Sequence, residues 1–528
     1  MIVKRNSCIS LSILFFCVSY TAGATYTLKV DLSNKIRPVT HCASGSLYGI
    51  TEQIPASVEE MIAPLKPCVF NQPAMSGPKH QHDNKTAAIP IAKRIAKTTA
   101  KVQIKLSDIN RGWPYQWPGQ AAWLDSVKKV INEKKASGLT NFDGYEIWNE
   151  PDGTWQAANG DFNTVCWKPT YDLIKSLDPD ARIIGPGLSY MNTTKIKDFL
   201  TFCRDKKCLP EVICWHQWGS AGLVGGIQSY RQLESSLGIS PRAITINEYS
   251  SRTSDPYEGC PGYSVPFIAK FERHGVESAC ISWWHTAYPG RLGSLLTPSN
   301  QKGGGWYLYK WYGDMTGQMV DITPPNDKSD GIDGFGCIDE SQNYASICLG
   351  GNNTGTVNVV ISGIPASWNK ISVKVEYVPW VNKDSPVTGP VAVSTKSYTV
   401  SNGTITIPVE VTSILYGYHI NINSESTGLG SLRLENEKIK LVNLSQNGSM
   451  AHITINAAQS GNASVDIYDL KGNLVRTASF KTTAGTTHDY SFSTGNFPKG
   501  YYGIVIRSGS YVRKSGLLLT GGSFTTSD

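Results

Sequence analysis

Eight alternations between a short apolar strand and a helical segment fill residues 45–315, and this repeat limits the possible folds more than any other feature. The clearest helical period covers 120–137, and Gly138 ends it. Eight strand–helix units over about 270 residues predict an α/β fold, a (β/α)8 or TIM barrel. An open doubly wound sheet is the alternative, but no GxGxxG motif opens a helix after an early strand. The strand candidates are 45–51, 67–72, 101–108, 144–149, 181–186, 212–218, 243–247 and 278–283.

After the barrel repeat, the apolar residues recur with a period of two, which is typical of β-strands. Alternating residues and closely spaced turns predict a β-sandwich beside the barrel. We assign 25–323 to the barrel and 324–423 to the sandwich, with 25–32 as a candidate strand of the sandwich. A linker of mostly small residues at 424–430 precedes a separate all-β domain at 431–528.

The C-terminal domain contains the run GYYGIVIRSGSYVRKSG, which ends in a basic hairpin. In this run it resembles the sorting or surface-attachment domains that close exported enzymes of some Gram-negative bacteria. The resemblance implies a contact with secretion machinery or attachment to the cell surface. A generic carbohydrate-binding or spacer module is the alternative.

The N-terminus has the pattern of a secretory signal peptide, which we place at 1–24. Lys4 and Arg5 precede an apolar run at 9–18, and Ala22-Gly23-Ala24 supplies small residues for cleavage. The apolar run is too short for a membrane span of about 20 residues, and no later segment supplies one. We therefore expect a secreted or cell-surface protein. The net charge of +7 is not gathered in a basic block, which argues against a nucleic-acid partner.

The chain has 12 cysteines, and export would bring most of them into a compartment where disulfides persist. The short-range pairs Cys203 with Cys208 and Cys337 with Cys348 are the predicted disulfides.

Metal ligands are poorly represented in the sequence. No CxxC pair or HExxH motif occurs, so we expect no zinc site and no cofactor. His80, His82 and Asp83 have the residue types of metal ligands, but no further ligand is evident nearby and a solvated loop is favoured.

Two glutamates at predicted strand ends carry the chemistry. The fourth strand runs into Asn149-Glu150-Pro151, which places Glu150 at the carboxyl-terminal mouth of the barrel, where catalytic groups of this fold lie. Glu248 ends the seventh strand, across the mouth from the fourth. Hydrolysis of a glycosidic bond needs one carboxyl to protonate the leaving oxygen and another to attack the anomeric carbon or activate water. The pair therefore predicts a glycosidase.

These motifs resemble the clan of retaining glycoside hydrolases that place the acid/base on strand four and the nucleophile on strand seven. The closest likeness is to glycoside hydrolase family 39, which includes β-xylosidases and α-iduronidases, and it spans roughly 40–425. It rests on EIWNEPD at 146–152, the IxEY pattern at 246–249, His216, and the Ser-Trp-Trp run at 282–284.

The resemblance implies a role for each matching residue. Glu150 would be the general acid/base and Glu248 the nucleophile. The negative charge of ionised Glu248 nearby should raise the pKa of Glu150. Asn149 would hydrogen-bond the sugar 2-hydroxyl, His216 would line the floor near Glu248, and Trp284 would form the sugar platform.

The chain departs from the family's xylosidases at two positions. It has Asn247 where they have threonine, and Trp218 where they have a tyrosine that would hydrogen-bond the nucleophile. These departures leave the proposed reaction unchanged but leave the identity of the substrate open.

Aromatic residues crowd the predicted loops at the barrel mouth, and flat rings with polar tips suit sugars. About half of them are expected to serve only in packing, because tryptophan is highly buried on average. The predicted substrate-binding aromatics are Trp155, Trp218, Trp283 and Trp284.

Together these features predict a secreted retaining glycosidase acting on extracellular polysaccharide or oligosaccharide, plant cell-wall material being favoured. The resemblance favours xylosides or arabinosides as substrates. The alternatives are a non-hydrolytic carbohydrate-binding surface protein and an endo-glycanase from a related family of the same clan. A binder would not need both carboxylates, which favours the enzyme.

Overall fold

The computed structural model describes residues 24–251, 257–282, 289–425 and most of 439–519. The predicted signal peptide, apart from Ala24, lies outside the described residues, as do Trp283 and Trp284. Among the helices of the described ranges, none is long and apolar enough to cross a membrane.

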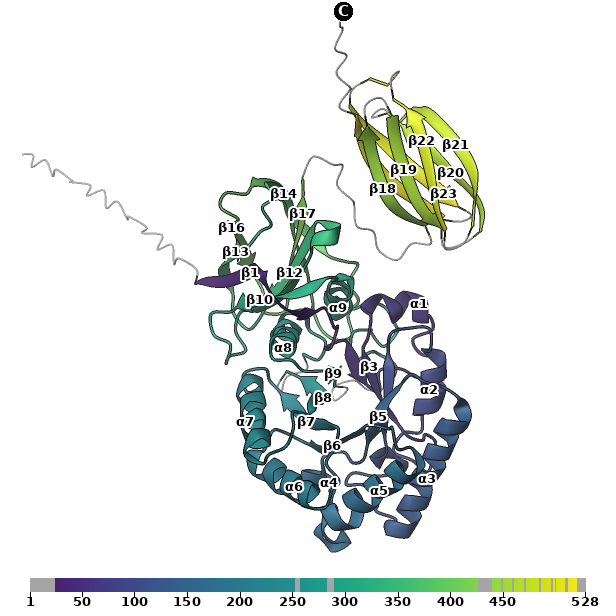
Figure 1. The fold of residues 1–528 in the computed structure, drawn as a ribbon, viewed down its shortest axis with the longest axis vertical. Helices are drawn as coiled ribbons and strands as arrows, with labels where there is room; N and C mark the ends of the chain where they lie inside the picture. Colours follow the sequence, from purple (N-terminus) through teal and green to yellow (C-terminus); the bar gives the residue numbers. More distant parts are fainter. Residues whose placement is uncertain are drawn as a thin grey trace, which may run out of the picture.

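Eight parallel strands close into a barrel, as the repeat predicts (Figure 1). They pair in chain order, and Gly45 beside Cys280 closes the ring between its last and first strands. This closure rules out the doubly wound alternative. The barrel strands are β2 (Gly45–Leu47), β3 (Val69–Pro73), β4 (Lys101–Lys105), β5 (Phe142–Glu146), β6 (Ile183–Leu188), β7 (Val212–Trp218), β8 (Ala243–Ser250) and β9 (Ser278–Ile281).

Helices surround the barrel and bury their apolar faces against it. In α3 (Gln120–Ser137), Trp123, Val127 and Ile131 are fully buried, and Gly138 ends the helix at a φ of 65°. The predicted helix at 120–137 is therefore confirmed at both ends. The others are α1 (Val58–Met61), α2 (Ala88–Arg94), α4 (Pro151–Thr154), α5 (Lys168–Leu177), α6 (Thr193–Asp205), α7 (Leu223–Ser236), α8 (Pro261–Arg273) and α9 (Gly304–Asp314). Short 3-10 or π turns are η1 (Ala63–Leu65), η2 (Ser107–Ile109), η3 (Ala157–Asn159), η4 (Asn163–Trp167) and η5 (Glu340–Gln342).

A nine-stranded sheet lies beside the barrel, with α8 and α9 between them (Figure 1). Its strand order is β15-β14-β17-β12-β11-β10-β1-β13-β16, so one continuous hydrogen-bonded sheet replaces the two separate sheets of the predicted sandwich. The strands are β1 (Thr25–Pro38), β10 (Gln318–Thr323), β11 (Asp333–Asp339), β12 (Tyr344–Gly350), β13 (Gly355–Ser362), β14 (Lys370–Val378), β15 (Val391–Thr399), β16 (Ile405–Val411) and β17 (Gly417–Ser424).

The first strand of the chain belongs to this sheet rather than to the barrel. β1 pairs antiparallel with β10 and parallel with β13, so the whole of this strand is part of the neighbouring sheet. A buried ion pair also joins the two units, because Lys270 on α8 lies 3.0 Å from Asp333 on β11 and each side chain is 1% exposed.

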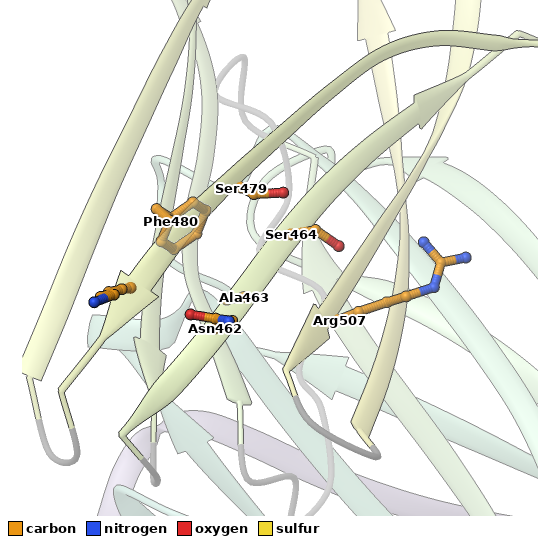
Figure 2. Close-up of a pocket in the computed structure, with 7 residues that line it drawn as sticks. Asn462, Ala463, Ser464, Ser479, Phe480 and Arg507 are labelled. Atoms are coloured by element: carbon orange, nitrogen blue, oxygen red, sulfur yellow. The ribbon is translucent and has the colours of Figure 1, made fainter.

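The C-terminal region folds as two antiparallel sheets around a core of its own, and the predicted all-β domain is confirmed. One sheet holds β18 (Ile439–Asn447), β19 (Met450–Ala457) and β22 (Thr486–Ser493). The other holds β20 (Gly461–Tyr468), β21 (Leu474–Thr482), β23 (Gly500–Ser508) and β24 (Tyr511–Leu519). A groove of about 450 Å³ lies on the second sheet. Figure 2 shows side chains that line it, among them Asn462, Phe480 and Arg507.

The two predicted disulfides are wrong, since every cysteine of the described residues is a free thiol. In the β11–β12 ladder, Cys337 pairs with Ser346 and Cys348 pairs with Phe335, so the two cysteines are diagonal rather than opposite. A disulfide between strands needs closely facing Cβ atoms, which this register does not give. Cys203 on α6 and Cys208 in the following turn are both buried thiols.

Candidate active site

A sharp turn after β5 presents Glu150 at the barrel mouth. Glu150 has a φ of 51° and caps α4, which begins at Pro151. The Thr154 hydroxyl lies 2.7 Å from the carbonyl oxygen of Asn149 and 2.9 Å from that of Glu150, and it accepts a hydrogen bond from the Trp148 indole. A left-handed non-glycine residue is strained, and such strain persists only where neighbours fix it, as they do here.

Glu248 reaches the same mouth from β8. It lies beside His216 of β7 in the parallel register, after an irregularity that follows Cys214. Glu248 is 6% exposed and His216 is fully buried.

His216 bridges the two glutamates. Its Nδ1 lies 2.8 Å from Oε1 of Glu150 and 3.1 Å from Oε2 of Glu248. One ligand atom from each of the three side chains lies within 4.8 Å of the others. The structure therefore brings together the two carboxylates that the sequence places at separate strand ends.

Burial and charge act in opposite directions on these three groups. Burial raises the pKa of Glu248 to about 7; Glu150 and Glu258 act in the same direction, against His216 and Lys105. Burial also raises the pKa of Glu150, but the hydrogen bond and charge of His216, with Lys105, outweigh it and leave that pKa below its ordinary value. Burial lowers the pKa of His216, but the two carboxylates outweigh it and raise that pKa.

The expected raised pKa of Glu150 is therefore wrong for the free protein. The sequence does not show that His216 donates its shorter hydrogen bond to Glu150, which stabilises the ionised form of this carboxyl. The raised pKa belongs to Glu248, the more deeply buried of the two.

A buried polar network under the mouth holds Asn149 in place. Lys105 at the end of β4 lies 2.6 Å from Oδ1 of Asn149 and 3.2 Å from Oε2 of Glu146, and Asn71 donates to the same Glu146 oxygen at 2.7 Å. Sequence reasoning missed Lys105 and Glu146. Each of them is a charged residue within an apolar strand. This signal could have indicated a buried ion pair, since a buried charge needs a partner.

The predicted aromatic platforms have different surroundings. Trp155 packs edge-on against Trp117, Trp148 and Phe162, and its indole donates to the Gly160 carbonyl at 2.8 Å. Trp218 ends β7 and is partly buried. A substrate-binding role for both residues stays a prediction, as it does for Trp283 and Trp284.

The expectation of a solvated loop around His80, His82 and Asp83 is wrong for His82. His82 is only 7% exposed, with its Nε2 3.8 Å from Oδ2 of Asp108, whereas the Asp83 side chain is 63% exposed. Asp108 also accepts a hydrogen bond from Tyr115 at 2.9 Å. His82 and Asp83 therefore lie in different environments, and the three loop residues do not form a group of converging ligand atoms.

A third carboxylate near the pair, Glu258, was also missed by sequence reasoning. It is fully buried in the turn before α8, and Ser282, directly after β9, donates a hydrogen bond to it. Glu258 and Ser282 are 24 residues apart in the sequence, and no local sequence pattern encodes their contact.

Comparisons with known proteins find a matching family for the C-terminal domain and a solved structure similar to most of the chain. Residues 447–518 match the secretion system C-terminal sorting domain, which confirms the predicted secreted or cell-surface location. N2152 from Neocallimastix frontalis, a solved structure, is 46% identical to the chain, covers 76% of it and all of its own length, and superimposes with a TM-score of 0.74.

The chain belongs to the same family as N2152.

Relatives of this N2152-like chain include named glycosidases, which confirms the resemblance to glycoside hydrolases. A 3-O-alpha-D-galactosyl-alpha-L-arabinofuranosidase of Bifidobacterium longum subsp. longum is 29% identical over 333 residues, 58% of the chain. The match covers only 27% of that larger protein. A GH39 β-xylosidase from Caulobacter crescentus, 16% identical, shares the fold with a TM-score of 0.52 over 75% of the chain and 99% of its own.

Proposed function

We propose that the N2152-like chain is a retaining glycoside hydrolase that works by double displacement. The observation that supports this most strongly is that one carboxylate oxygen of Glu150 lies within 4.8 Å of one carboxylate oxygen of Glu248. Retaining enzymes hold their two carboxyls about 5–5.5 Å apart, whereas inverting enzymes leave about 6.5–9.5 Å for a water molecule. The groove of the C-terminal domain has no carboxylate in its lining and offers no comparable site.

In this proposal Glu150 is the acid/base and Glu248 is the nucleophile. The pair and His216 share protons, so they titrate as a unit rather than as separate groups. When substrate is bound, ionised Glu248 attacks the anomeric carbon, and the C–O bond breaks as Glu150 protonates the leaving oxygen. Water activated by Glu150 then releases the sugar from Glu248.

We favour an arabinoside or xyloside of extracellular polysaccharide as the substrate, and the name of the Bifidobacterium relative favours α-L-arabinofuranosyl groups. The test is product analysis on arabinogalactan, xylan and glucan, together with aryl α-L-arabinofuranosides and aryl β-D-xylosides. We expect release of arabinose-containing product and hydrolysis of the aryl arabinofuranoside. Binding of a polysaccharide with no product from any substrate would instead support the non-hydrolytic alternative.

Activity should depend on pH through the proton that the carboxylate pair shares. The pKa of Glu248 is about 7, so kcat/KM should fall as pH rises through about 7, when the carboxylate pair loses its shared proton. In His216→Asn, the loss of the imidazolium removes an interaction that lowers the pKa of both glutamates. Both limbs of the profile should therefore move to higher pH. A profile that His216→Asn leaves in place would contradict the bridging role of His216.

Chelation should leave the activity unchanged. Glu150, His216 and Glu248 form the one group of three potential metal ligands found among the described residues. Double displacement uses both carboxylates directly, so an ion held between them would block the reaction. Assays before and after dialysis against EDTA check this expectation. Loss of turnover that a divalent ion restores would show that the group binds a metal needed for catalysis.

A further inference from the structure

The contacts of Lys105 are not those expected of a lysine that serves only in a buried ion pair. Its ammonium group is fully buried under the barrel mouth, where desolvation of a charge is costly. The carboxylate of Glu146, at 3.2 Å, compensates part of that cost. The shorter contact, 2.6 Å, goes instead to the side-chain oxygen of Asn149, the neighbour of Glu150. Because the shortest hydrogen bond of this buried charge goes to the Asn149 amide, Lys105 is suited to position Asn149.

The chemistry of this contact fixes the orientation of the Asn149 amide. A lysine ammonium has three N–H donors and no acceptor, so the amide atom facing it must be oxygen. The Nδ2 group then points away from Lys105. Among the described residues, no group accepts a hydrogen bond from Nδ2, and Asn149 keeps 5% of its surface exposed at the mouth. The amide therefore has a donor group available at the barrel mouth.

We propose that Lys105 is a positioning residue that orients Asn149 to donate a hydrogen bond to the sugar 2-hydroxyl. This inference rests on the proposed function. Hydrogen bonds to the 2-hydroxyl strengthen in the transition state of glycoside hydrolysis. Without Lys105 the amide can turn over and offer its oxygen, or it can lose its fixed position, and the 2-hydroxyl contact is lost with it.

The groups around Lys105 hold its ammonium in place and keep it charged, which also supports the positioning role. Asn71 donates to the Glu146 oxygen that faces Lys105, at 2.7 Å, so the acceptor that anchors the ammonium is itself held. Burial lowers the pKa of Lys105, but Glu146, Asp108 and Glu248 outweigh it and raise that pKa. The group therefore stays charged and keeps donating.

The test compares a reactive aryl glycoside with its 2-deoxy analogue in four enzymes: wild type, Asn149→Ala, Glu146→Gln, and the double variant K105M/E146Q. The double variant is preferred to Lys105→Met alone, because the single change leaves Glu146 buried without its cation. Glu146→Gln is the matched control, since it removes the negative charge but keeps a side-chain oxygen that can accept from Lys105 and Asn71, so Lys105 stays anchored beside Asn149. Thermal melts establish that each variant is folded.

The quantity measured is the ratio of kcat/KM for the glycoside to kcat/KM for its 2-deoxy analogue. We expect this ratio to fall by about tenfold or more in Asn149→Ala, and to the same value in K105M/E146Q, with the loss in kcat rather than KM. Glu146→Gln should keep the wild-type ratio. A wild-type ratio in K105M/E146Q, or an equal loss in Glu146→Gln, would overturn the role of Lys105. Wild-type protein that hydrolyses neither substrate would refute the proposed function itself and this inference with it.

Discussion

Glu248→Ala is expected to lower kcat by about 10⁴-fold or more, because the glycosyl-enzyme intermediate can no longer form. Added azide should restore part of the turnover of an activated aryl glycoside. Azide enters from the face that Glu248 leaves empty, forms the C–N bond as the aryl oxygen departs, and so gives a glycosyl azide of inverted configuration. Steady-state kinetics and NMR of the azide product check both points.

Stability distinguishes this loss from unfolding. The pKa of Glu248 is about 7 in the folded chain and about 4.5 when unfolded, so the ionised group opposes folding above pH 7 and not below pH 4.5. Glu248→Ala should therefore raise the melting temperature at pH 8 and lose this advantage as pH falls to 4.5. The matched control is Glu277→Ala, at the opposite end of the barrel, where the side chain is 45% exposed and pairs with Arg182. It should keep wild-type kinetics, and equal inactivation of the two variants would refute the assignment of Glu248.

Glu150→Ala is expected to show a loss that depends on the leaving group. For a natural glycoside, whose leaving oxygen needs a proton, kcat/KM should fall by about 10²–10⁴-fold. For a dinitrophenyl glycoside, whose leaving group departs without a proton, kcat/KM should stay within about tenfold of wild type. Measuring kcat/KM across aryl glycosides of graded leaving-group pKa checks this expectation.

Azide separates the role of Glu150 from that of Glu248. In Glu150→Ala, azide should react with the glycosyl-enzyme intermediate in place of activated water, so the glycosyl azide should have the retained configuration. An inverted product from this variant, or the same fractional loss for all leaving groups, would mean that Glu150 is not the acid/base.

Local sequence patterns predicted much of the fold. The helix at Gln120–Ser137 and the strand at Val212–Trp218 have the predicted bounds, because periodic burial and a glycine stop act within a few residues. Strand pairing across long separations was not predictable in the same way. The two-residue offset that puts Cys337 opposite Ser346 rather than Cys348 excludes a disulfide, and no sequence spacing reveals it.

In the candidate site too, the residues marked by local patterns were predictable, and those that depend on tertiary contacts were not. Glu150 and Glu248 were predictable because each follows an apolar strand, and parallel strands in a barrel open at one mouth. Lys105 and Glu146 were missed because each looks like an isolated break in an apolar pattern, and their pairing is tertiary. The lowered pKa of Glu150 depends on the 2.8 Å contact from His216, which comes from a different strand.

The most direct test of the proposed double displacement is the configuration of the first sugar released. Proton NMR during the first minutes of hydrolysis of an aryl glycoside reports it before mutarotation mixes the anomers. With Glu150 and Glu248 as an acid/base and nucleophile pair, the first hemiacetal must have the anomeric configuration of the substrate. Appearance of the opposite anomer first would contradict the account.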